Sequence, residues 1–263
     1  MCIGLEFSGW WLILVIGCLV VKSAYWRIWR LAQAPYLSFT YYSSPKMPKI
    51  YSTEPEDGEQ FTEQYDAFYA RFASAYDWLV KVFPVWRNWL DTTLPWIQGP
   101  RVLEASFGTG YLLTQYADQF EAHGIDLNPN LARVARDNLQ HCSLTAHIQV
   151  ANVESLPYAA AAFDSVISTM AFTAYPDGKR ALAEISRVLK PGGRIVMLDI
   201  NYPHNGNKIG TLLTRGWKAG GDIIRDLPDL FERIGYEFTD REVGGFGSVH
   251  LYIATKPEQK GIF

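Results

Sequence analysis

From Arg101 onward, short apolar segments alternate with segments in which apolar residues recur every three or four positions. The first pattern is typical of buried strands, and the second is typical of helices that pack on one side. Strands are predicted at Arg101–Ala105, Ala122–Asp126, Ala146–Val150, Ser165–Thr169, Arg194–Ile200, Glu237–Val243 and Val249–Thr255. Helices are predicted at Tyr111–Phe120, Asn130–Leu139, Gly178–Leu189 and Leu227–Gly235.

This alternation predicts an α/β fold with a mostly parallel sheet and helices on both faces. The last two strands are joined by the short turn GGFG, which predicts that they form an antiparallel pair. The hydrophobic share of the chain is 48%, and a segment of about 200 residues is long enough to form one domain with a buried core.

The beginning of the chain has a different pattern. Phe7–Val21 is an uninterrupted run of apolar, glycine and serine residues. As a helix this run spans only ~22 Å, and about five further helical residues would let it cross a ~30 Å hydrocarbon core. The positive residues Lys22, Arg27 and Arg30 all follow the run. We therefore expect residues 1–35 to form a single-pass membrane anchor, with the rest of the chain on the cytoplasmic side.

Three alternatives remain for this segment. A cleavable signal peptide carries its basic residues before the apolar run, whereas here they follow it. Val15–Cys18 is similar to a lipoprotein processing site, but the apolar run continues past Cys18. The third alternative is a helix that lies in the membrane interface or is buried in the protein.

Between the anchor and the α/β part, the pattern changes twice. Residues 36–60 are predicted to be a linker, because Ser43–Gln60 is polar, contains three prolines and lacks periodicity. Over residues 61–98, apolar and aromatic residues recur at helical spacing, which predicts helices that form a cap before the sheet. Residues 99–263 then form the predicted α/β domain.

The overall composition excludes some classes of function. The net charge of −3 provides no extended basic surface for nucleic acid, so nucleic acid is not an expected partner. The three cysteines, Cys2, Cys18 and Cys142, lack the spacing of a zinc site or a disulfide framework, so no metal is predicted. The sequence gives no indication of an oligomeric state.

The first strand of the α/β part leads into a glycine-containing turn, VLEASFGTGYLL, from Val102 to Leu113. Gly108 and Gly110 lie in this turn, and Asp126 ends the next strand. A strand, a glycine-containing turn, a helix and a second strand ending in a carboxylate are typical of one half of an adenosine-binding Rossmann unit. The dinucleotide form G-x-G-x-x-G would place a third glycine at position 113. Leu113 stands there, so a nicotinamide-dependent oxidoreductase is a disfavoured alternative.

Two later segments extend the pattern, ANVESLPYAAAAFDSVIST from residue 151 and RALAEISRVLKPGGRIVMLDI from residue 180. With them, roughly Phe61–Pro257 resembles the class I S-adenosylmethionine-dependent methyltransferases of the type 11 group. Within this group it is most similar to the ubiquinone/menaquinone C-methyltransferases and the bacterial phospholipid N-methyltransferases. The resemblance implies a Rossmann-like seven-stranded sheet whose last strand is antiparallel, and S-adenosylmethionine as cofactor. It does not specify a substrate.

The resemblance, together with the turn chemistry, predicts a set of cofactor-binding residues at the ends of the first four strands. Glu104 is expected to hold the ammonium group of the ligand, and Asp126 its two ribose hydroxyls. Gly108 and Gly110 are expected to let the backbone approach it. The full predicted set is Glu104, Ser106, Phe107, Gly108, Thr109, Gly110, Asp126, Leu127, Asn152, Val153 and Thr169.

Structural alternatives remain for these residues. Glu104 could be a solvated acid at the end of a strand, the glycines could be ordinary turn residues, and Asp126 could cap the following helix. Two positions also depart from the family pattern. Asn152 follows the third strand where the family usually has an aspartate that contacts the adenine amine, and its carbonyl can accept the same hydrogen bond. Ser106 stands where the family's first turn glycine usually lies, and its side chain restricts the backbone.

Aromatic and titratable residues outside this set are candidates for the substrate and for catalysis. Aromatic faces attract a sulfonium or a cationic amine, so Tyr65, Tyr69, Phe172 and Tyr175 are predicted to contact the substrate, with core packing as the alternative for each. An acceptor that must lose a proton needs a base. The candidates are His204, in the NYPHNGN loop after the fifth strand, and the pair Tyr76 and Asp77 in the cap. The alternative for His204 is an exposed loop residue.

Taken together, the sequence predicts a membrane-tethered methyltransferase that faces the cytoplasm and acts on a lipophilic acceptor. A quinone or other isoprenoid ring is favoured as the acceptor, followed by a phospholipid amine. Two alternatives stay open. One is a degenerate methyltransferase fold that serves as a binding or scaffold protein at the membrane. The other is a methyltransferase for a small soluble metabolite.

Overall fold

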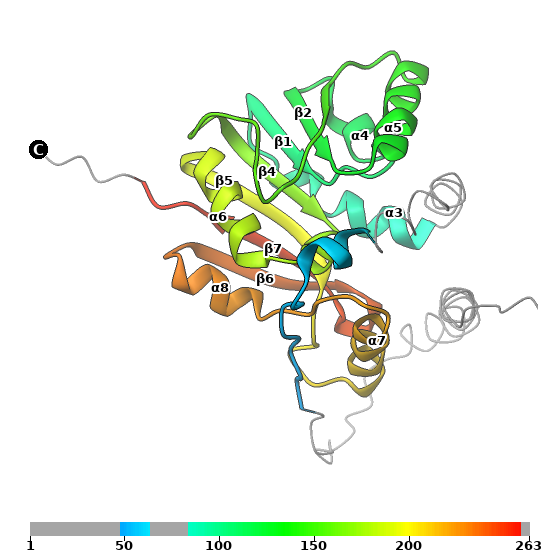
Figure 1. The fold of residues 1–263 in the computed structure, drawn as a ribbon, viewed down its shortest axis with the longest axis vertical. Coiled ribbons are helices and arrows are strands. Elements are labelled where there is room, and N and C mark those ends of the chain that lie inside the picture. Colours follow the sequence, from blue (N-terminus) through cyan, green and yellow to red (C-terminus); the bar gives the residue numbers. More distant parts are fainter. Residues whose placement is uncertain (1–47, 64–83, 259–263) are drawn as a thin grey trace, which may run out of the picture. The chain divides into compact units, whose positions relative to one another are not determined.

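A seven-stranded sheet lies at the centre of the computed structural model, which describes residues 48–63 and 84–258 (Figure 1). The strands are β1 Arg101–Ala105, β2 Glu121–Asp126, β3 His147–Val150, β4 Phe163–Thr169, β5 Leu189–Ile200, β6 Glu237–Gly244 and β7 Val249–Thr255. Their order across the sheet is β3-β2-β1-β4-β5-β7-β6. The pairs from β3 to β5 are parallel, and β7 runs antiparallel to both β5 and β6. The predicted fold class is therefore confirmed for the sheet.

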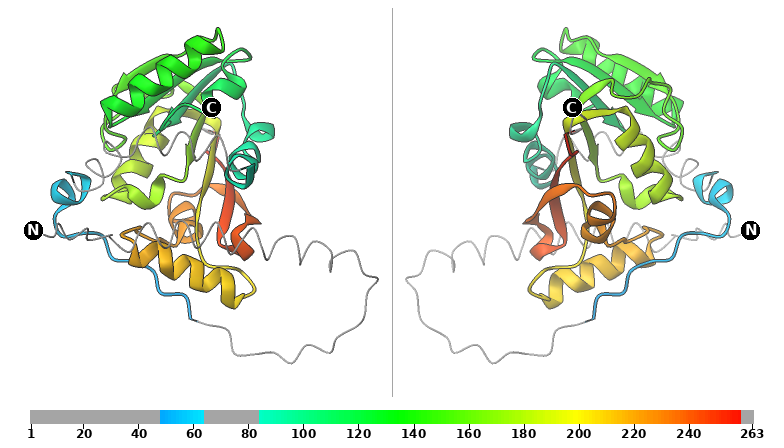
Figure 2. Two further views of the ribbon diagram at one scale, coloured as in Figure 1. Left: turned by 90° about the vertical axis from the view of Figure 1, so that its right-hand side faces the viewer. Right: turned by 90° about the vertical axis from the view of Figure 1, so that its left-hand side faces the viewer.

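Helices connect most of these strands and cover both faces of the sheet (Figure 2). They are α3 Pro84–Asp91, α4 Leu113–Tyr116, α5 Pro129–His141, α6 Gly178–Val188, α7 Lys208–Ala219 and α8 Leu227–Arg233. Residues 58–63 are also helical. Polar residues cap the longer helices: the side chains of Asn128, Asp177 and Asn207 accept backbone N–H groups in the first turns of α5, α6 and α7.

Two hydrophobic cores form because alternate residues of each buried strand point to opposite faces. On β5, Ile195 and Met197 pack into one core, and Val196 and Leu198 pack into the other. Helices α6 and α8 complete the first core, and α3, α4 and α5 contribute to the second. Burial on both faces explains why these strands are continuously apolar in the sequence.

Two helices differ from the prediction. The predicted helix Tyr111–Phe120 is reduced to α4, because the chain turns at residues 117–119 to enter β2 at Glu121. Helix α7 was not predicted. Its fully buried residues are Gly210, Thr211 and Thr214, whereas the large apolar residues Ile209 and Leu212 are exposed, so the buried side lacks the large apolar residues by which sequence analysis finds a helix.

Part of the predicted linker is attached to the domain. Residues 48–54, here called the strap, run along α7 (Figure 2). The Lys218 ammonium group donates to the backbone oxygens of Ile50 and Tyr51, at 2.9 Å each. Ser52 N donates to Ile224 O at 2.7 Å, and the Tyr51 ring meets the Tyr202 ring edge-on at 5.8 Å. The end of the linker is therefore a fixed part of the fold.

None of the described helices is both long and apolar enough to cross a membrane. The predicted anchor, residues 1–35, lies outside the described residues, as do the cap residues Tyr65, Tyr69, Tyr76 and Asp77. The predictions for these residues therefore remain predictions.

Candidate active site

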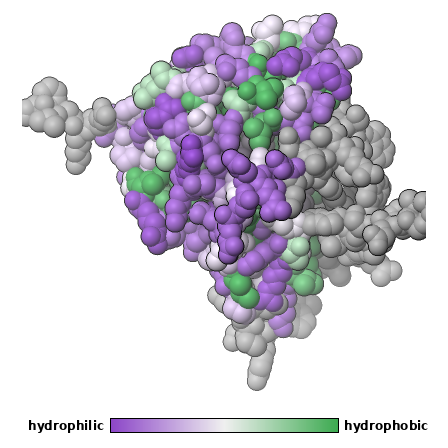
Figure 3. Space-filling model, in the orientation of Figure 1, coloured by the Kyte–Doolittle hydropathy of each residue, from purple (hydrophilic) through white to green (hydrophobic). Residues whose placement is uncertain are grey.

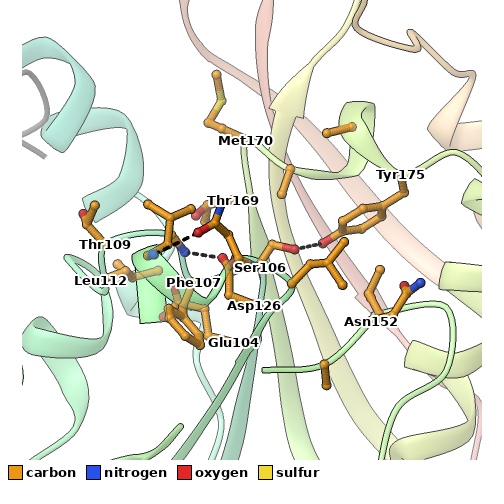
Figure 4. A pocket seen from close by; sticks show the side chains of 18 of the residues that line it. Glu104, Ser106, Phe107, Thr109, Leu112, Asp126, Asn152, Thr169, Met170 and Tyr175 are labelled. Atoms are coloured by element: carbon orange, nitrogen blue, oxygen red, sulfur yellow. Dashed lines mark hydrogen bonds between the residues drawn. The ribbon is translucent and has the colours of Figure 1, made fainter. Parts of the chain in front are cut away.

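A pocket opens at the carboxyl ends of β1, β2 and β4, where parallel α/β sheets commonly bind their ligands (Figure 4). Helix α3 contributes Trp86 and Leu90 to its wall, and the helical segment 58–63 contributes Thr62. Ten of the eleven residues predicted to bind the cofactor line this pocket: Glu104, Ser106, Phe107, Gly108, Thr109, Asp126, Leu127, Asn152, Val153 and Thr169. Tyr175, predicted to contact the substrate, lines it as well.

Glu104 lies at the bottom of the pocket and is 2% exposed. Burial raises the pKa of its carboxyl group to about 8, and the nearby Asp126 carboxylate also raises it. The Tyr116 hydroxyl donates to Glu104 Oε2 at 3.1 Å and offsets part of this rise. A buried acid with such a raised pKa is an acceptor for a cation, because a positive group beside it would stabilise the carboxylate.

Asp126 holds the turn in place from the end of β2. Its Oδ2 accepts Gly108 N at 2.8 Å, and its Oδ1 accepts Asn128 N at 2.9 Å. The carboxylate thus connects the β1 turn to the start of α5, and both segments line the pocket. Asn128, rather than Asp126, is the N-cap of α5, so the alternative role considered for Asp126 is wrong.

The two turn glycines have different roles. Gly108 has φ +57°, and a Cβ built there would meet no atom within 4 Å, so its surface is open on the pocket side. Gly110 does not line the pocket. A Cβ at Gly110 would lie 2.8 Å from Ala135 Cβ, so this glycine is required for close packing of the turn on α5. Gly110 therefore has a packing role, and its predicted contact with the cofactor remains a prediction.

Ser106 adopts the left-handed backbone conformation that favours glycine, with φ +61°. This conformation costs a non-glycine residue about 1–2 kcal/mol. Two contacts compensate: Ser106 N donates to Ile125 O at 2.8 Å, and the Tyr175 hydroxyl donates to Ser106 Oγ at 3.0 Å (Figure 4). The serine therefore keeps the glycine-type turn and ties it to Tyr175.

Asn152 and Met170 line the pocket after β3 and β4 (Figure 4). Asn152 Oδ1 accepts Glu154 N at 2.8 Å, which fixes the side chain at the pocket wall. Met170 has φ +52°, and its N–H donates to Leu198 O at 2.6 Å. Sequence analysis did not identify Met170, because a methionine after a strand carries no distinctive signal.

The methyltransferase domain family matches residues 103–197. The ubiquinone/menaquinone biosynthesis C-methyltransferase of Syntrophotalea carbinolica is 33% identical over 179 residues, which are 62% of this chain and 76% of that protein. The chain belongs to the class I S-adenosylmethionine-dependent methyltransferases. The enzyme of the same name from Geotalea daltonii is 29% identical over 159 residues, 56% of this chain and 66%, just under two thirds, of that protein.

Solved structures agree on the fold of this methyltransferase. An S-adenosylmethionine-dependent methyltransferase from Thermotoga maritima, described as a possible histamine N-methyltransferase, has a TM-score of 0.57 at 18% identity. The match covers 72% of this chain and 98% of the Thermotoga chain. At this identity the similarity concerns the fold alone.

The residues of the pocket fit S-adenosylmethionine. Glu104 is a buried acid that would ionise beside the cationic ammonium group of the cofactor. The Asp126 carboxylate lines the pocket and can accept hydrogen bonds from hydroxyl groups. Gly108 provides bare backbone, and the pocket wall includes the apolar residues Leu127 and Val153. The cofactor of this methyltransferase is S-adenosylmethionine.

Two other predictions are corrected by the structure. Phe172 is 1% exposed and packs in the core below the Arg225 guanidinium, so it does not line the pocket. His204 also lies away from the pocket lining. It contacts Asp240 and Glu242 of β6. β6 is an edge strand of the sheet, separated by β5 and β7 from the strands β2, β1 and β4 that form the pocket.

Proposed function

We propose that this methyltransferase transfers a methyl group to a ring carbon of a lipophilic quinone-type acceptor at a membrane surface. The observation that carries the proposal is the similarity to ubiquinone/menaquinone C-methyltransferases, including 33% identity over 179 residues with the Syntrophotalea protein. A demethylmenaquinone methyltransferase from Deinococcus radiodurans is 32% identical over 146 residues and supports the same acceptor class.

Methyl transfer depends mainly on the alignment of the acceptor with the methyl group, because the leaving group is already activated. The bound cofactor supplies an electrophilic methyl group on a sulfonium centre. Glu104 would hold its ammonium group and Asp126 its ribose hydroxyls, and Trp86, Leu90 and Met170 form an apolar part of the pocket wall. Tyr175 is 6% exposed, and its hydroxyl is engaged by Ser106 and Ser168, so it positions the turn.

A ring carbon that gains a methyl group must also lose its proton to a base. Among the predicted bases, His204 lies away from the pocket lining, and Tyr76 and Asp77 lie outside the described residues. We propose Asp77 as the base, with Tyr76 beside it, because a cap segment that precedes β1 can reach over the carboxyl ends of the strands.

The proposed location is the cytoplasmic face of a membrane, with residues 1–35 as the anchor. Helix α7 supports this location independently of the anchor. Ile209 is 52% exposed and Leu212 is 66% exposed, the exposed cationic Lys208 lies on the same helix, and the helix carries no acidic residue. Exposed apolar residues beside cationic ones are typical of a helix that rests on anionic lipid.

Figure 3 shows one face of the described domain. It is mostly hydrophilic, and its hydrophobic residues form small separate areas. Such scattered areas are ordinary for a soluble surface and need no partner.

The test is an assay of the full chain in lipid vesicles with methyl-labelled S-adenosylmethionine. Three acceptors are offered separately: a reduced quinone with an isoprenoid tail and an open ring position, phosphatidylethanolamine, and an aqueous metabolite extract. We expect label in the quinone, and Asp126→Ala should lower cofactor affinity at least tenfold. Label in phosphatidylethanolamine alone or in aqueous products alone would overturn the proposed acceptor. Cofactor binding without transfer to any acceptor would favour a scaffold protein.

A further inference from the structure

Three side chains from separate elements meet at the β6 edge of the sheet. His204 follows β5, Asp240 lies on β6 and His250 lies on β7. His204 Nε2 is 2.8 Å from Asp240 Oδ2, and His250 Nδ1 is 2.7 Å from Asp240 Oδ1. One nitrogen or oxygen atom from each residue lies within 4.8 Å of the others, which is close enough for all three to contact one ion. None of the three lines the cofactor pocket.

The contacts of His250 show which of its nitrogens is available to a metal. Nε2 is 2.9 Å from Gly247 O, and a carbonyl oxygen can only accept, so Nε2 carries the hydrogen. Nδ1 faces a second acceptor, the Asp240 carboxylate. With the hydrogen on Nε2, the lone pair of Nδ1 points toward Asp240, and this is the form in which a neutral imidazole binds a metal ion.

The imidazole rings of His204 and His250 also have contacts of the kind that orient metal-binding histidines. Metal-binding histidines generally donate their other ring N–H to a carbonyl or carboxylate. His250 does so to Gly247 O, and His204 Nδ1 lies 3.4 Å from Glu242 Oε1. His250 is 1% exposed and stacks on the Tyr252 ring at 5.7 Å, so its orientation is held by packing.

We propose that His204, Asp240 and His250 bind a divalent transition-metal ion, for which Zn²⁺ is best suited. Two imidazole nitrogens and one carboxylate oxygen are ordinary zinc ligands. The side chain of His204 is 48% exposed, so solvent reaches the ion and a water molecule can complete a tetrahedral set. Sequence analysis predicted no metal because it considered cysteine spacing, whereas these ligands are 10 to 46 positions apart.

A second cluster also contains two histidines and one carboxylate, but it is not suited to a metal ion. Glu121, His123 and His147 also lie close together. The Arg101 guanidinium, however, lies 3.0 Å from Glu121 Oε1 and 3.4 Å from His123 Nε2, so a permanent cation already occupies this cluster. Among the described contacts of the His204 cluster, no Lys or Arg plays this part. His147 therefore provides a matched control.

The proposed ion would join the loop after β5 to the hairpin that β6 and β7 form. The loop that contains His204 leads into α7, which starts at Lys208, and α7 holds the strap. An ion shared by this loop, β6 and β7 would fix the position of α7 on the sheet. Because the ligands are not assembled in the unfolded chain, binding would stabilise the fold.

The test uses the tag-free full chain in detergent, stripped with a chelator and titrated with Zn²⁺ alone. We expect one equivalent to bind at micromolar or lower concentration, to raise the melting temperature and to bind more weakly at lower pH, since protons compete for the ligands. His204→Ala and Asp240→Asn should each weaken binding at least tenfold, and His147→Ala should not. The exposed position of His204 makes its variant safe for folding.

Two further measurements complete the test. Co²⁺ in place of Zn²⁺ should give the visible absorption of a tetrahedral site in the wild type and lose it in His204→Ala. Binding of S-adenosylmethionine should be unchanged in this variant, so failure of the metal proposal and failure of the proposed function are distinguishable. The proposal is overturned if no Zn²⁺ binds, or if binding is the same in wild type, His204→Ala and Asp240→Asn.

Discussion

At the scale of single residues, the least expected property is the chemistry of Glu104. The sequence identifies an acid at the end of a strand, but only the structure shows that it is buried and that its pKa is raised to about 8. The difference matters because an acid with an ordinary pKa is charged at neutral pH, whereas Glu104 of the cofactor-free chain holds its proton there. Cofactor binding and proton release are therefore coupled.

Glu104 predicts a pH dependence of cofactor affinity. Binding a cationic group requires the carboxylate form, which becomes more abundant as the pH rises toward about 8. We expect the affinity for S-adenosylmethionine to increase between about pH 6 and 7.5, by up to about tenfold per unit, with release of a proton. Glu104→Gln should bind more weakly and lose this slope. Calorimetry in buffers of different ionisation enthalpy measures both quantities.

The same group provides an independent check on the free chain. Its pKa is higher in the folded state than the ordinary value of 4.5, so the folded state binds more protons between these values. Stability of the cofactor-free chain should therefore fall as the pH rises from 4.5 to about 8, and fall less in Glu104→Gln. Glu237→Gln, at the exposed start of β6, should behave like the wild type. Equal pH slopes in all three proteins would contradict the assignment.

Residue identity alone could not show which of the other predicted site residues face the pocket. Gly108 and Gly110 are equivalent in the sequence, and both have positive φ, but only the fold shows that one faces the pocket and the other faces α5. His204 does follow a strand that ends at the pocket side of the sheet, as predicted. The order of strands, which local patterns do not reveal, places it beside β6.

At the scale of elements, the strands were the most predictable part. All seven were located, the buried ones by their apolar runs, and the bounds of β1 and β7 agree with the prediction to the residue. A strand buried on both faces has a strong signal. The large apolar residues Ile209 and Leu212 of helix α7 are exposed, so the helix lacks a clear pattern of buried apolar residues. The strap is held through its backbone carbonyls, which the sequence of side chains does not reveal.

The packing of the β1 turn on α5 leads to a prediction about Gly110. Gly110 and Gly235 share the same φ of +73°, but a Cβ at Gly235 meets no atom within 4 Å, whereas at Gly110 it would lie 2.8 Å from Ala135 Cβ. Gly235→Ala should cost about 1–2 kcal/mol for the backbone alone. Gly110→Ala should cost about 2–5 kcal/mol, because steric overlap is added.

Urea unfolding of the two variants measures this difference directly. Since the backbone cost is shared, the excess loss in Gly110→Ala reports the contact with α5. Gly216 lies in the interior of α7, and a Cβ built there would meet no atom within 4 Å. We expect a third variant, Gly216→Ala, to stabilise the fold by up to about 1 kcal/mol. If Gly110→Ala and Gly235→Ala lost the same stability, the close packing described here would be incorrect.

At the scale of the whole molecule, the proposed membrane location concerns α7 and the strap that is attached to it. The strap begins at residue 48, and its carbonyls are held by Arg215 and Lys218 of α7. Under the proposed membrane location, this helix would lie near the lipid. The exposed Ile209 and Leu212 on the same helix are consistent with such a position.

This arrangement predicts that α7 affects reactions of membrane-dissolved acceptors only. In Leu212→Glu, an apolar contact with lipid is lost and a charge is added that anionic lipid repels. We expect the KM for a long-tailed quinone in anionic vesicles to rise roughly five- to tenfold, equivalent to about 1 kcal/mol. The KM for a short-tailed, water-soluble quinone should stay unchanged, because the pocket residues are untouched. Ile234→Glu, which also replaces an exposed apolar residue but lies at the end of α8, is the control and should leave both values unchanged. A rise in KM for both acceptors would show that Leu212→Glu disturbs the pocket, and no rise for the long-tailed acceptor would show that α7 does not lie at the membrane.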